Sequence, residues 1–378
     1  MKTTFASTNS FFALFFVVLT ILMTACSPKD SDINPESEIT LNSARASVND
    51  SVSTLKMVAS FPIGAGPSVA VVKNTNAYKM FFEQFDAKTV HAYMNIEESK
   101  GKFNFKEADY WVQQAQSNPM RLHGHCLVYH IATPDWLTKI KATGEFEAVV
   151  KNHIQTVVSR YKGKIKSWDV INEIFEANPS NPNSNIKNTI FRALYASDDA
   201  YMAFVQRCFV WAHEADPNAL LFYNDNAFDN TPARLNGFLK FAADCKRNGI
   251  PLHGVGTQMH IDINTPEAGI QSSLKALAAT GLQVHISEMD IKVNTKGDNN
   301  MVFTTEVLNK QRAKYQFVAT AYKQLVPVSQ QYGITMWDMG DSDSWIVKMR
   351  NEHDVPTLFD SQYKKKPAFF GLLEGLKN

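Results

Sequence analysis

Between about residue 55 and the end of the chain, short apolar runs alternate with longer amphipathic stretches. The runs that we predict as strands lie at 57–59, 89–94, 121–129, 166–173, 220–225, 254–260, 283–290 and 334–339. Helical patterns separate them, among others at 78–85, 107–117, 146–161, 199–214, 234–248 and 309–331. Because each return to the next strand requires a crossover, the strands pair in parallel. Eight such units in about 320 residues predict an α/β fold, a single closed (β/α)₈ TIM barrel, rather than an open doubly wound sheet.

The sequence lacks the signatures of nucleotide and nucleic-acid binding. No GxGxxG follows the first predicted strand, and no GxxxxGK[ST] occurs. The 38 Lys and Arg residues and 37 Asp and Glu residues leave a formal net charge of +1. No overall charge therefore attracts nucleic acid or an anionic membrane, and we expect no nucleic-acid partner.

The first 25 residues are typical of an export signal. Lys2 precedes an apolar run at 11–23, which is too short for a membrane span and suits a secretory signal. The small residues directly before Cys26 resemble a bacterial lipobox, in which Cys26 is lipidated and becomes the new N-terminus. The alternative is an ordinary cleaved signal peptide with an incidental cysteine. Stable anchoring takes two acyl-chain signals, so we expect a mature protein tethered to a membrane.

Residues 26–54 are predicted to form a flexible tether, and residues 55–378 a single folded domain. The tether is rich in Ser, Asn, Asp and Glu and has no apolar periodicity. Ser27 is not the Asp that favours inner-membrane retention, and 29–32 (KDSD) resembles surface-export signals of Bacteroidetes lipoproteins. These features predict a lipoprotein at the outer membrane or cell surface of a Gram-negative bacterium. They leave open which membrane face holds it.

Three cysteines follow the tether, at Cys126, Cys208 and Cys245. An odd number without a paired spacing favours buried thiols over a functional pair, although the sequence leaves their redox state open.

Polar residues gather at the ends of the predicted strands, where a TIM barrel keeps its active site. These clusters lie at 123–130, 168–173, 223–225, 258–260, 287–290 and 336–338. Within them, Glu173 and Glu288 each close a strong apolar run on a different strand. Cleavage of an acetal needs one carboxyl group to protonate the leaving oxygen and another to stabilise or attack the sugar carbon. The two glutamates therefore predict glycoside hydrolysis.

A metal site is the competing chemical interpretation, because the chain has 10 His. His123 and His125 point the same way on a strand and, with His130, have the side chains to bind zinc. No HExxH and no second His–carboxylate pair at fixed spacing accompanies them. We therefore expect neither a metal nor another cofactor.

Several of these segments together resemble glycoside hydrolase family 10, the family of endo-β-1,4-xylanases. The resemblance covers nearly the whole chain after the tether, and its order and spacing are specific. The matching segments are 101–105 (GKFNF), 124–130 (GHCLVYH), 168–173 (WDVINE), 254–260 (GVGTQMH), 286–291 (ISEMDI), Trp337, 343–345 (DSW), 359–360 (FD) and 366–368 (KPA).

The resemblance implies a retaining double displacement. In it, Glu173 is the general acid/base and Glu288 the nucleophile, and the two carboxyl groups should lie about 5–5.5 Å apart. Asn172 matches the residue that hydrogen-bonds the sugar 2-hydroxyl, a contact that strengthens in the transition state. Gln258 and His260 match the partners of the two glutamates.

The remaining matched residues surround this pair. The resemblance implies that Asp290 orients His260 and that His125 hydrogen-bonds the glycone sugar. Trp337 and Trp345 match aromatic walls of the same site.

The chain departs from the family at the second strand, in the segment 91–96. Where the family has a glutamate, an asparagine and a lysine that contact the glycone, this chain has His91, Ala92 and Asn95. The family's tryptophan on the third strand is Tyr129. We still expect Asn95 and Tyr129 to contact the sugar. We also expect a weaker or wider distal glycone subsite, with space at Ala92 for a substituent on the sugar.

The resulting hypothesis is an enzyme, a retaining endo-β-1,4-xylanase that acts on xylan or substituted xylan and works as a monomer. Two alternatives stay open: a β-glycosidase for a different or modified polysaccharide, and a catalytically weak glycan-binding lipoprotein. The altered second strand also leaves the endo or exo preference open.

Overall fold

The structure is a computed structural model that describes residues 53–177 and 184–377. The predicted signal peptide, Cys26 and most of the predicted tether lie outside the described residues. All described residues belong to one compact unit, Ser51–Asn378.

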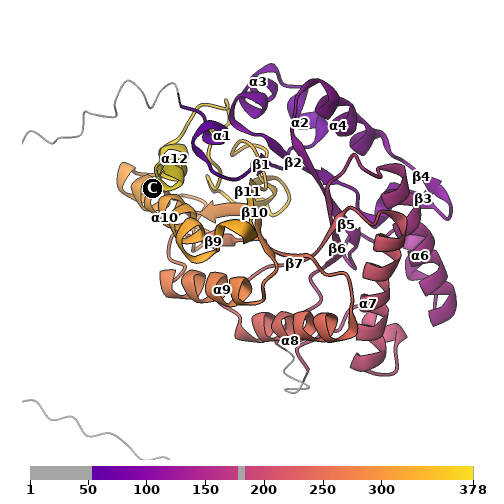
Figure 1. Ribbon diagram of the computed structural model, residues 1–378. Helices are drawn as coiled ribbons and strands as arrows, with labels where there is room; N and C mark the ends of the chain where they lie inside the picture. Colours follow the sequence, from indigo (N-terminus) through magenta and orange to yellow (C-terminus); the bar gives the residue numbers. More distant parts are fainter. Residues whose placement is uncertain (1–52, 178–183, 378) are drawn as a thin grey trace, which may run out of the picture. The chain divides into compact units, whose positions relative to one another are not determined.

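Eight parallel strands form a closed barrel (Figure 1). In order around the barrel they are β1 (Ile63–Ala65), β2 (Ala87–His91), β5 (Arg121–Val128), β6 (Ser167–Asn172), β7 (Leu220–Asp225), β8 (Gly254–Thr257), β10 (Gln283–Lys292) and β11 (Gln331–Met336). The barrel closes where β11 pairs with β1, with Ile334 opposite Ile63. The predicted (β/α)₈ fold is confirmed.

Helices surround the strands on the outside of the barrel (Figure 1). The longer ones are α3 (Thr75–Gln84), α4 (Lys106–Ser117), α6 (Thr143–Arg160), α7 (Asp198–Ala215), α8 (Pro232–Asn248), α9 (Glu267–Ala279), α10 (Thr305–Leu325) and α12 (Pro367–Lys377). Short elements complete the fold: α1 (Leu55–Val58), α2 (Val69–Val72), η1 (Met94–Ile96), β3 (Glu97–Ser99), β4 (Lys102–Phe103), α5 (Asp135–Thr138), η2 (Arg192–Leu194), β9 (His260–Asp262), η3 (Val328–Gln330) and α11 (Trp345–Lys348).

Local sequence explains where the central helices begin and end. The Ser197 side chain accepts a hydrogen bond from the Ala200 N–H and caps α7, while Pro232 occupies the first turn of α8. Gly249 ends α8 in the left-handed conformation, with φ of 66°. These caps fix the two helices that flank β7. Across the described ranges, no helix is long and apolar enough to cross a membrane.

The strand predicted at 57–59 is wrong, because this segment belongs to α1 and the turn after it. The first strand is β1, which lies six residues later and contains Gly64. A Cβ at Gly64 would lie 2.8 Å from Thr335 Oγ1 and 3.1 Å from Ala87 Cβ. The neighbouring strands approach so closely that a small residue is required, and the apolar signal of β1 is correspondingly weak.

Other predicted boundaries also shift. The helix predicted at 309–331 runs too far, since α10 ends at Leu325 and Gln331 already begins β11. The helices α9 and α12 lie outside the helical patterns named from the sequence. The strand predicted at 254–260 is divided into β8 and β9 around Gln258 and Met259.

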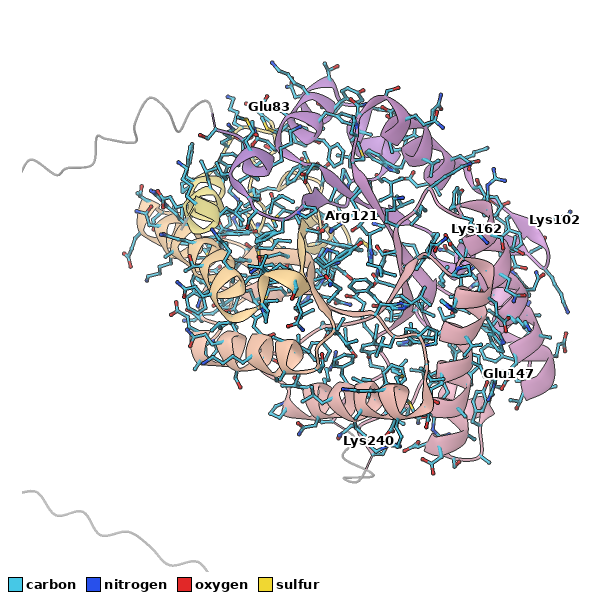
Figure 2. All side chains as sticks on the ribbon, viewed as in Figure 1. Glu83, Lys102, Arg121, Glu147, Lys162 and Lys240 are labelled. Carbon is cyan, nitrogen blue, oxygen red and sulfur yellow. The ribbon has the colours of Figure 1, made fainter. Side chains whose placement is uncertain are left out.

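A buried polar layer fills the barrel below the strand ends. His123 Nδ1 lies 2.6 Å from Ser167 Oγ, and His285 Nε2 lies 2.8 Å from Thr335 Oγ1. Figure 2 shows Arg121 within the ring of helices, whereas Lys240 projects from the outer face of α8.

The three cysteines of the described ranges, Cys126, Cys208 and Cys245, are buried and unpaired, which confirms the prediction of buried thiols.

Candidate active site

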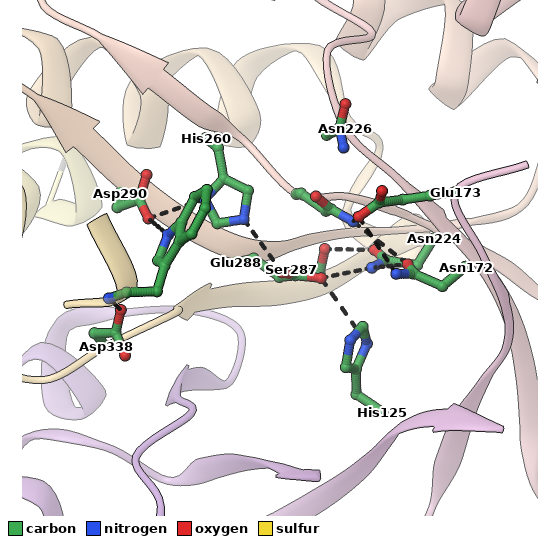
Figure 3. Close-up of polar contacts among 12 residues, drawn as sticks. His125, Asn172, Glu173, Asn224, Asn226, His260, Ser287, Glu288, Asp290 and Asp338 are labelled. Carbon is green, nitrogen blue, oxygen red and sulfur yellow. Dashed lines mark hydrogen bonds and ion pairs between the residues drawn. The ribbon is translucent and has the colours of Figure 1, made fainter. Parts of the chain in front are cut away.

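The two predicted catalytic carboxyl groups lie at the C-terminal ends of their strands. Glu173 follows β6 directly, and Glu288 lies within β10 (Figure 3). Glu173 has a φ of 56°, a conformation that costs free energy in a residue other than glycine. Its N–H donates a hydrogen bond of 3.0 Å to the Asn224 carbonyl at the end of β7, which helps hold this turn.

Three side-chain amides connect the two carboxyl groups. Gln258 Nε2 donates to Glu173 Oε1 at 3.0 Å and to Asn172 Oδ1 at 3.3 Å. Asn224 Nδ2 donates to the same Asn172 oxygen at 2.9 Å and to Glu288 Oε1 at 2.6 Å. The amide chain fixes both carboxyl groups relative to Asn172, because each donor is shared between a carboxyl group and this oxygen.

Glu288 lies between two histidines. His260 Nε2 lies 3.2 Å from Glu288 Oε2, and His125 Nδ1 lies 3.9 Å from Glu288 Oε1. Both oxygens of Glu288 therefore face nitrogen atoms, and its side chain is only 6% exposed. This is the environment of a carboxylate that acts as an acceptor.

His260 is positioned by a second carboxylate. Its Nδ1 lies 2.9 Å from Asp290 Oδ2, and Trp345 Nε1 donates to the same oxygen at 2.8 Å. Burial opposes a charged imidazole, but Asp290 and Glu288 outweigh it and raise the pKa of His260 to about 10. His260 is thus a cation beside Glu288 at neutral pH.

The environment of Glu173 differs from that of Glu288. Lys187 Nζ lies 3.6 Å from Glu173 Oε2, and Tyr129 forms a hydrogen bond with the same side chain. Burial raises the pKa of Glu173, but the Gln258 hydrogen bond and the Lys187 charge outweigh burial. The net pKa lies below the ordinary value.

Trp337 lies among the histidine rings of the site. Its ring lies 5.3 Å from the rings of both His91 and His125, and 6.3 Å from that of His260. His91 also stacks on Tyr93, with ring centres 5.5 Å apart. Burial and the charges of Lys88 and His125 hold the pKa of His91 well below its ordinary value.

One expectation for the second-strand departures is not met. Ala92 is fully buried in the hydrophobic core and donates its N–H to the His125 carbonyl, so the expected space for a sugar substituent at Ala92 is absent. Asn95 is exposed in η1, and its N–H donates to the Ala132 carbonyl. The expected contact between Asn95 and the sugar stays a prediction. Both positions follow the end of β2, so the alternation of a strand does not apply to them.

The structure also accounts for the histidines considered as zinc ligands. His123 Nε2 and His125 Nδ1 both contact Asp169 Oδ2, at 2.9 Å and 2.8 Å. His125 therefore belongs to a buried ion-pair network beneath Glu288. Within residues 53–177 and 184–377, no three His, Cys, Asp or Glu side chains are grouped as metal ligands would be.

Sequence reasoning missed two residues of this site. Asn224 was noted only as part of a polar strand end, yet it contacts both Asn172 and Glu288. Lys187 lies in the segment after β6, and no motif marks it. Its place beside Glu173 depends on how that segment folds back.

The comparison with known families identifies this arrangement. The family model of glycosyl hydrolase family 10 matches residues 54–375. The chain belongs to glycosyl hydrolase family 10. The resemblance inferred from the motifs is thereby confirmed, and the match covers the whole barrel.

Individual relatives agree with this assignment. The chain is 31% identical over 367 residues to the endo-beta-1,4-xylanase Xyn10C of Cellvibrio japonicus, a match that covers 89% of this chain and 60% of that protein. It is 30% identical over 318 residues to an endo-1,4-beta-xylanase of Agaricus bisporus, covering 83% of this chain and 87% of the relative.

A solved structure shows the same fold. Xylanase 10C (mutant E385A) from Cellvibrio japonicus, in complex with xylopentaose, superposes with a TM-score of 0.78 at 30% identity. That comparison covers 86% of this chain and 69% of the xylanase chain.

Proposed function

We propose that this chain is a retaining glycoside hydrolase that cleaves internal β-1,4-xylosidic bonds of xylan. The observation that carries the proposal is the pair Glu173 and Glu288, held by the shared amides of Gln258, Asn172 and Asn224 at the strand ends of a family 10 barrel. The similar proteins are named as endo-1,4-β-xylanases, and one binds xylopentaose in its solved structure.

In the first step, a Glu288 oxygen attacks the anomeric carbon while Glu173 donates its proton to the leaving oxygen. In the second step, Glu173 takes a proton from water, and the resulting nucleophile displaces Glu288 from the sugar. Two displacements retain the anomeric configuration. Asn172 is placed between the carboxyl groups, where its amide binds the sugar 2-hydroxyl and strengthens that bond in the transition state.

The two glutamates have different neighbours, so the two carboxyl groups are not equivalent. Glu288 faces His260 and Asn224 and forms the bond to the anomeric carbon in the first step. Glu173 exchanges a proton in both steps. The presence of both Glu173 and Glu288 also argues against a glycan-binding protein without turnover. Such a protein would not need a second, separately held carboxyl group.

The test is hydrolysis of linear xylohexaose, followed by NMR of the first product anomer. We expect the β-anomer first, and an α-anomer would contradict a retaining mechanism. Glu288→Gln should abolish turnover. Glu173→Ala should still form the glycosyl-enzyme from an aryl xylobioside whose leaving group needs no protonation, and then release it slowly. A burst followed by slow turnover is therefore expected from Glu173→Ala alone.

We further propose that the protein is exported, lipidated at Cys26 and anchored at the outer membrane or cell surface, and that it acts as a monomer. The apolar run at 11–23 and the small residues before Cys26 support the anchor. Cys26→Ala should release the protein from membranes. Protease treatment of intact cells should remove it only if it faces outward, and light scattering of the released domain should give the monomer mass.

A further inference from the structure

Asp338 is a carboxyl group of the site that the proposed reaction does not use. It follows Trp337 after the end of β11, is partly exposed, and accepts a hydrogen bond of 2.8 Å from the Trp345 N–H through Oδ2 (Figure 3). Within residues 53–177 and 184–377, Oδ1 has no hydrogen-bond partner, and it is not one of the buried polar atoms left without one. This oxygen is therefore open to the cleft, where it can bind a substrate hydroxyl.

Asp338 lies on the glycone side of the site. Because Glu173 protonates the leaving oxygen, the sugars retained by the enzyme extend from Glu288 away from Glu173. In Figure 3, Asp338 and Glu173 lie on opposite sides of Glu288. His260, which contacts Glu288, is also one of the charged groups that act on Asp338. The carboxyl group is thus placed beyond the sugar that bonds to Glu288, where the second glycone sugar lies.

Tyr93 approaches the same part of the site from the end of β2. Its ring stacks on His91, with ring centres 5.5 Å apart, and meets the His125 ring edge-on at 5.4 Å. Burial raises the pKa of Tyr93 well above its ordinary value, and the charges of Glu288 and Asp338 add to this effect, so the hydroxyl keeps its proton. In the part of the chain that the structure describes, this hydroxyl has no hydrogen-bond partner and is not enclosed.

The backbone on both sides of Tyr93 is tied down. The Ala92 N–H donates to the His125 carbonyl at 2.7 Å, and the Asn95 N–H donates to the Ala132 carbonyl at 3.1 Å. Tyr93 is therefore held against β5 and the segment after it, and its hydroxyl is preorganised for a ligand rather than carried on a free loop.

The two groups are complementary to the hydroxyls of a sugar. A phenol both donates and accepts a hydrogen bond, and a carboxylate accepts. Burial raises the pKa of Asp338 to about 7, although the Trp345 hydrogen bond and the His260 charge oppose it. Near neutral pH both forms of the carboxyl group are present, and each can bind a hydroxyl.

We propose that Asp338 and Tyr93 are specificity-determining residues that hydrogen-bond the second glycone sugar, next to the sugar that bonds to Glu288. This inference rests on the proposed hydrolysis of xylan. Neither residue is among the glycone contacts that the family resemblance assigns. From the ends of β11 and β2, they supply polar contacts in place of those lost through the departures at 91–96. The preferred substrates therefore carry free hydroxyl groups on the second glycone sugar.

The experiment compares an aryl β-xyloside with the matching aryl β-xylobioside, because the second substrate adds only the second glycone sugar. We expect the wild-type kcat/KM to be roughly 100-fold higher for the xylobioside, the effect of two buried hydrogen bonds. Asp338→Asn keeps an oxygen for the Trp345 N–H, and Tyr93→Phe keeps the ring. Each should lower kcat/KM for the xylobioside roughly tenfold and leave that for the xyloside nearly unchanged.

The matched control is Asp343→Asn, which makes the same change in the same loop. The Asp343 oxygens are already bound, one by Lys348 at 3.4 Å and the other by the Tyr363 hydroxyl at 2.8 Å. This variant should keep the wild-type ratio of the two kcat/KM values.

A modified substrate separates recognition from a structural role. A xylobioside whose distal sugar lacks the 2- and 3-hydroxyls should lose most of its advantage in the wild-type protein, without any substitution. For this substrate, Asp338→Asn should cause no further loss of kcat/KM, because the hydroxyls that the carboxyl group binds are already missing.

The outcomes are distinguishable. Equal wild-type kcat/KM for the xyloside and the xylobioside would overturn the inference and leave xylan hydrolysis standing. So would a ratio that Asp338→Asn and Tyr93→Phe leave unchanged, or an equal loss on both substrates. Absence of hydrolysis of both the xylobioside and xylohexaose would instead overturn the proposed function.

Discussion

His260 Nε2 lies 3.2 Å from Glu288 Oε2, and the His260 side chain is only 18% exposed. The same imidazole is held through Nδ1 by Asp290, whose second donor is the indole of Trp345. The imidazole beside Glu288, the proposed nucleophile, is therefore held by Asp290 and Trp345. Asp290 both orients the imidazole and raises its pKa, whereas Trp345 acts through its hydrogen bond to Asp290.

Replacing His260 with Asn should lower kcat roughly 100-fold, because a preorganised charge at the nucleophile is lost. Trp345→Phe, which removes one hydrogen bond to Asp290 and leaves the imidazole in place, should lower kcat much less. An equal loss of kcat in the two variants would mean that the orientation of the imidazole, rather than its charge, is what assists the reaction.

The shared donor Asn224 should matter as much as a residue that contacts substrate. Asn224→Ala removes the donor to Glu288 and to Asn172 together, and one such buried hydrogen bond is worth about 1–3 kcal/mol. We expect kcat to fall by about 10- to 100-fold with a smaller change in KM, measured on xylohexaose. Ser287→Ala is the matched control, because its hydroxyl bonds the other atom of the Asn224 amide, at 2.7 Å. An equal loss of kcat in Asn224→Ala and Ser287→Ala would mean that the orientation of the Asn224 amide matters, rather than the hydrogen bonds that its Nδ2 donates.

The strand ends explain why much of the site was predictable. Gln258, His260 and Asp290 follow or close apolar runs, and parallel strands bring such ends together whatever the details of packing. Lys187 was not predictable, because its position depends on backbone pairing between 174–176 and 185–187, to which side-chain patterns contribute little.

The errors in the fold have the same physical origin. Strand β1 has only three residues, and its central Gly64 is dictated by the closeness of Thr335 rather than by apolar periodicity. The expected space at Ala92 was inferred from residue size alone, whereas burial depends on the neighbours that close over a small side chain.

A close approach of β5 and β6 yields a prediction about stability. A Cβ at Gly124 would lie 2.1 Å from Trp168 Cε3, whereas a Cβ at Gly144, in α6, would meet no atom within 4 Å. Gly124→Ala should lower the unfolding free energy by about 1–3 kcal/mol or more, because the added methyl group overpacks the space beside Trp168. Gly144→Ala should be neutral or stabilise the helix by up to about 1 kcal/mol. Urea denaturation of both variants tests this pair, and a tolerated Gly124→Ala would mean that the Trp168 ring can move.

The buried Lys88 should make the protein more stable as the pH rises. Its side chain is 1% exposed, its Nζ lies 4.6 Å from the Trp111 ring centre, and it donates a hydrogen bond to the Thr89 carbonyl. Burial lowers the pKa of Lys88 to about 7, against an opposing charge from Glu107. A folded-state pKa below the unfolded value of 10.5 means that the charged form is disfavoured by folding. The cost is full below pH 7 and disappears as the pH rises to 10.5.

Lys88→Met keeps the length of the side chain and removes the charge. We expect it to be roughly 2–4 kcal/mol more stable than the wild-type protein at pH 6, with a smaller difference at pH 9. Urea denaturation at both pH values measures the difference. The control is Lys56→Met, at a partly exposed lysine that donates to the Phe82 carbonyl. Its difference in unfolding free energy from the wild-type protein should be the same at pH 6 and pH 9. A stability difference for Lys88→Met that stays constant between pH 6 and pH 9 would indicate a packing effect rather than a buried charge, because the substitution removes the titrating ammonium of Lys88.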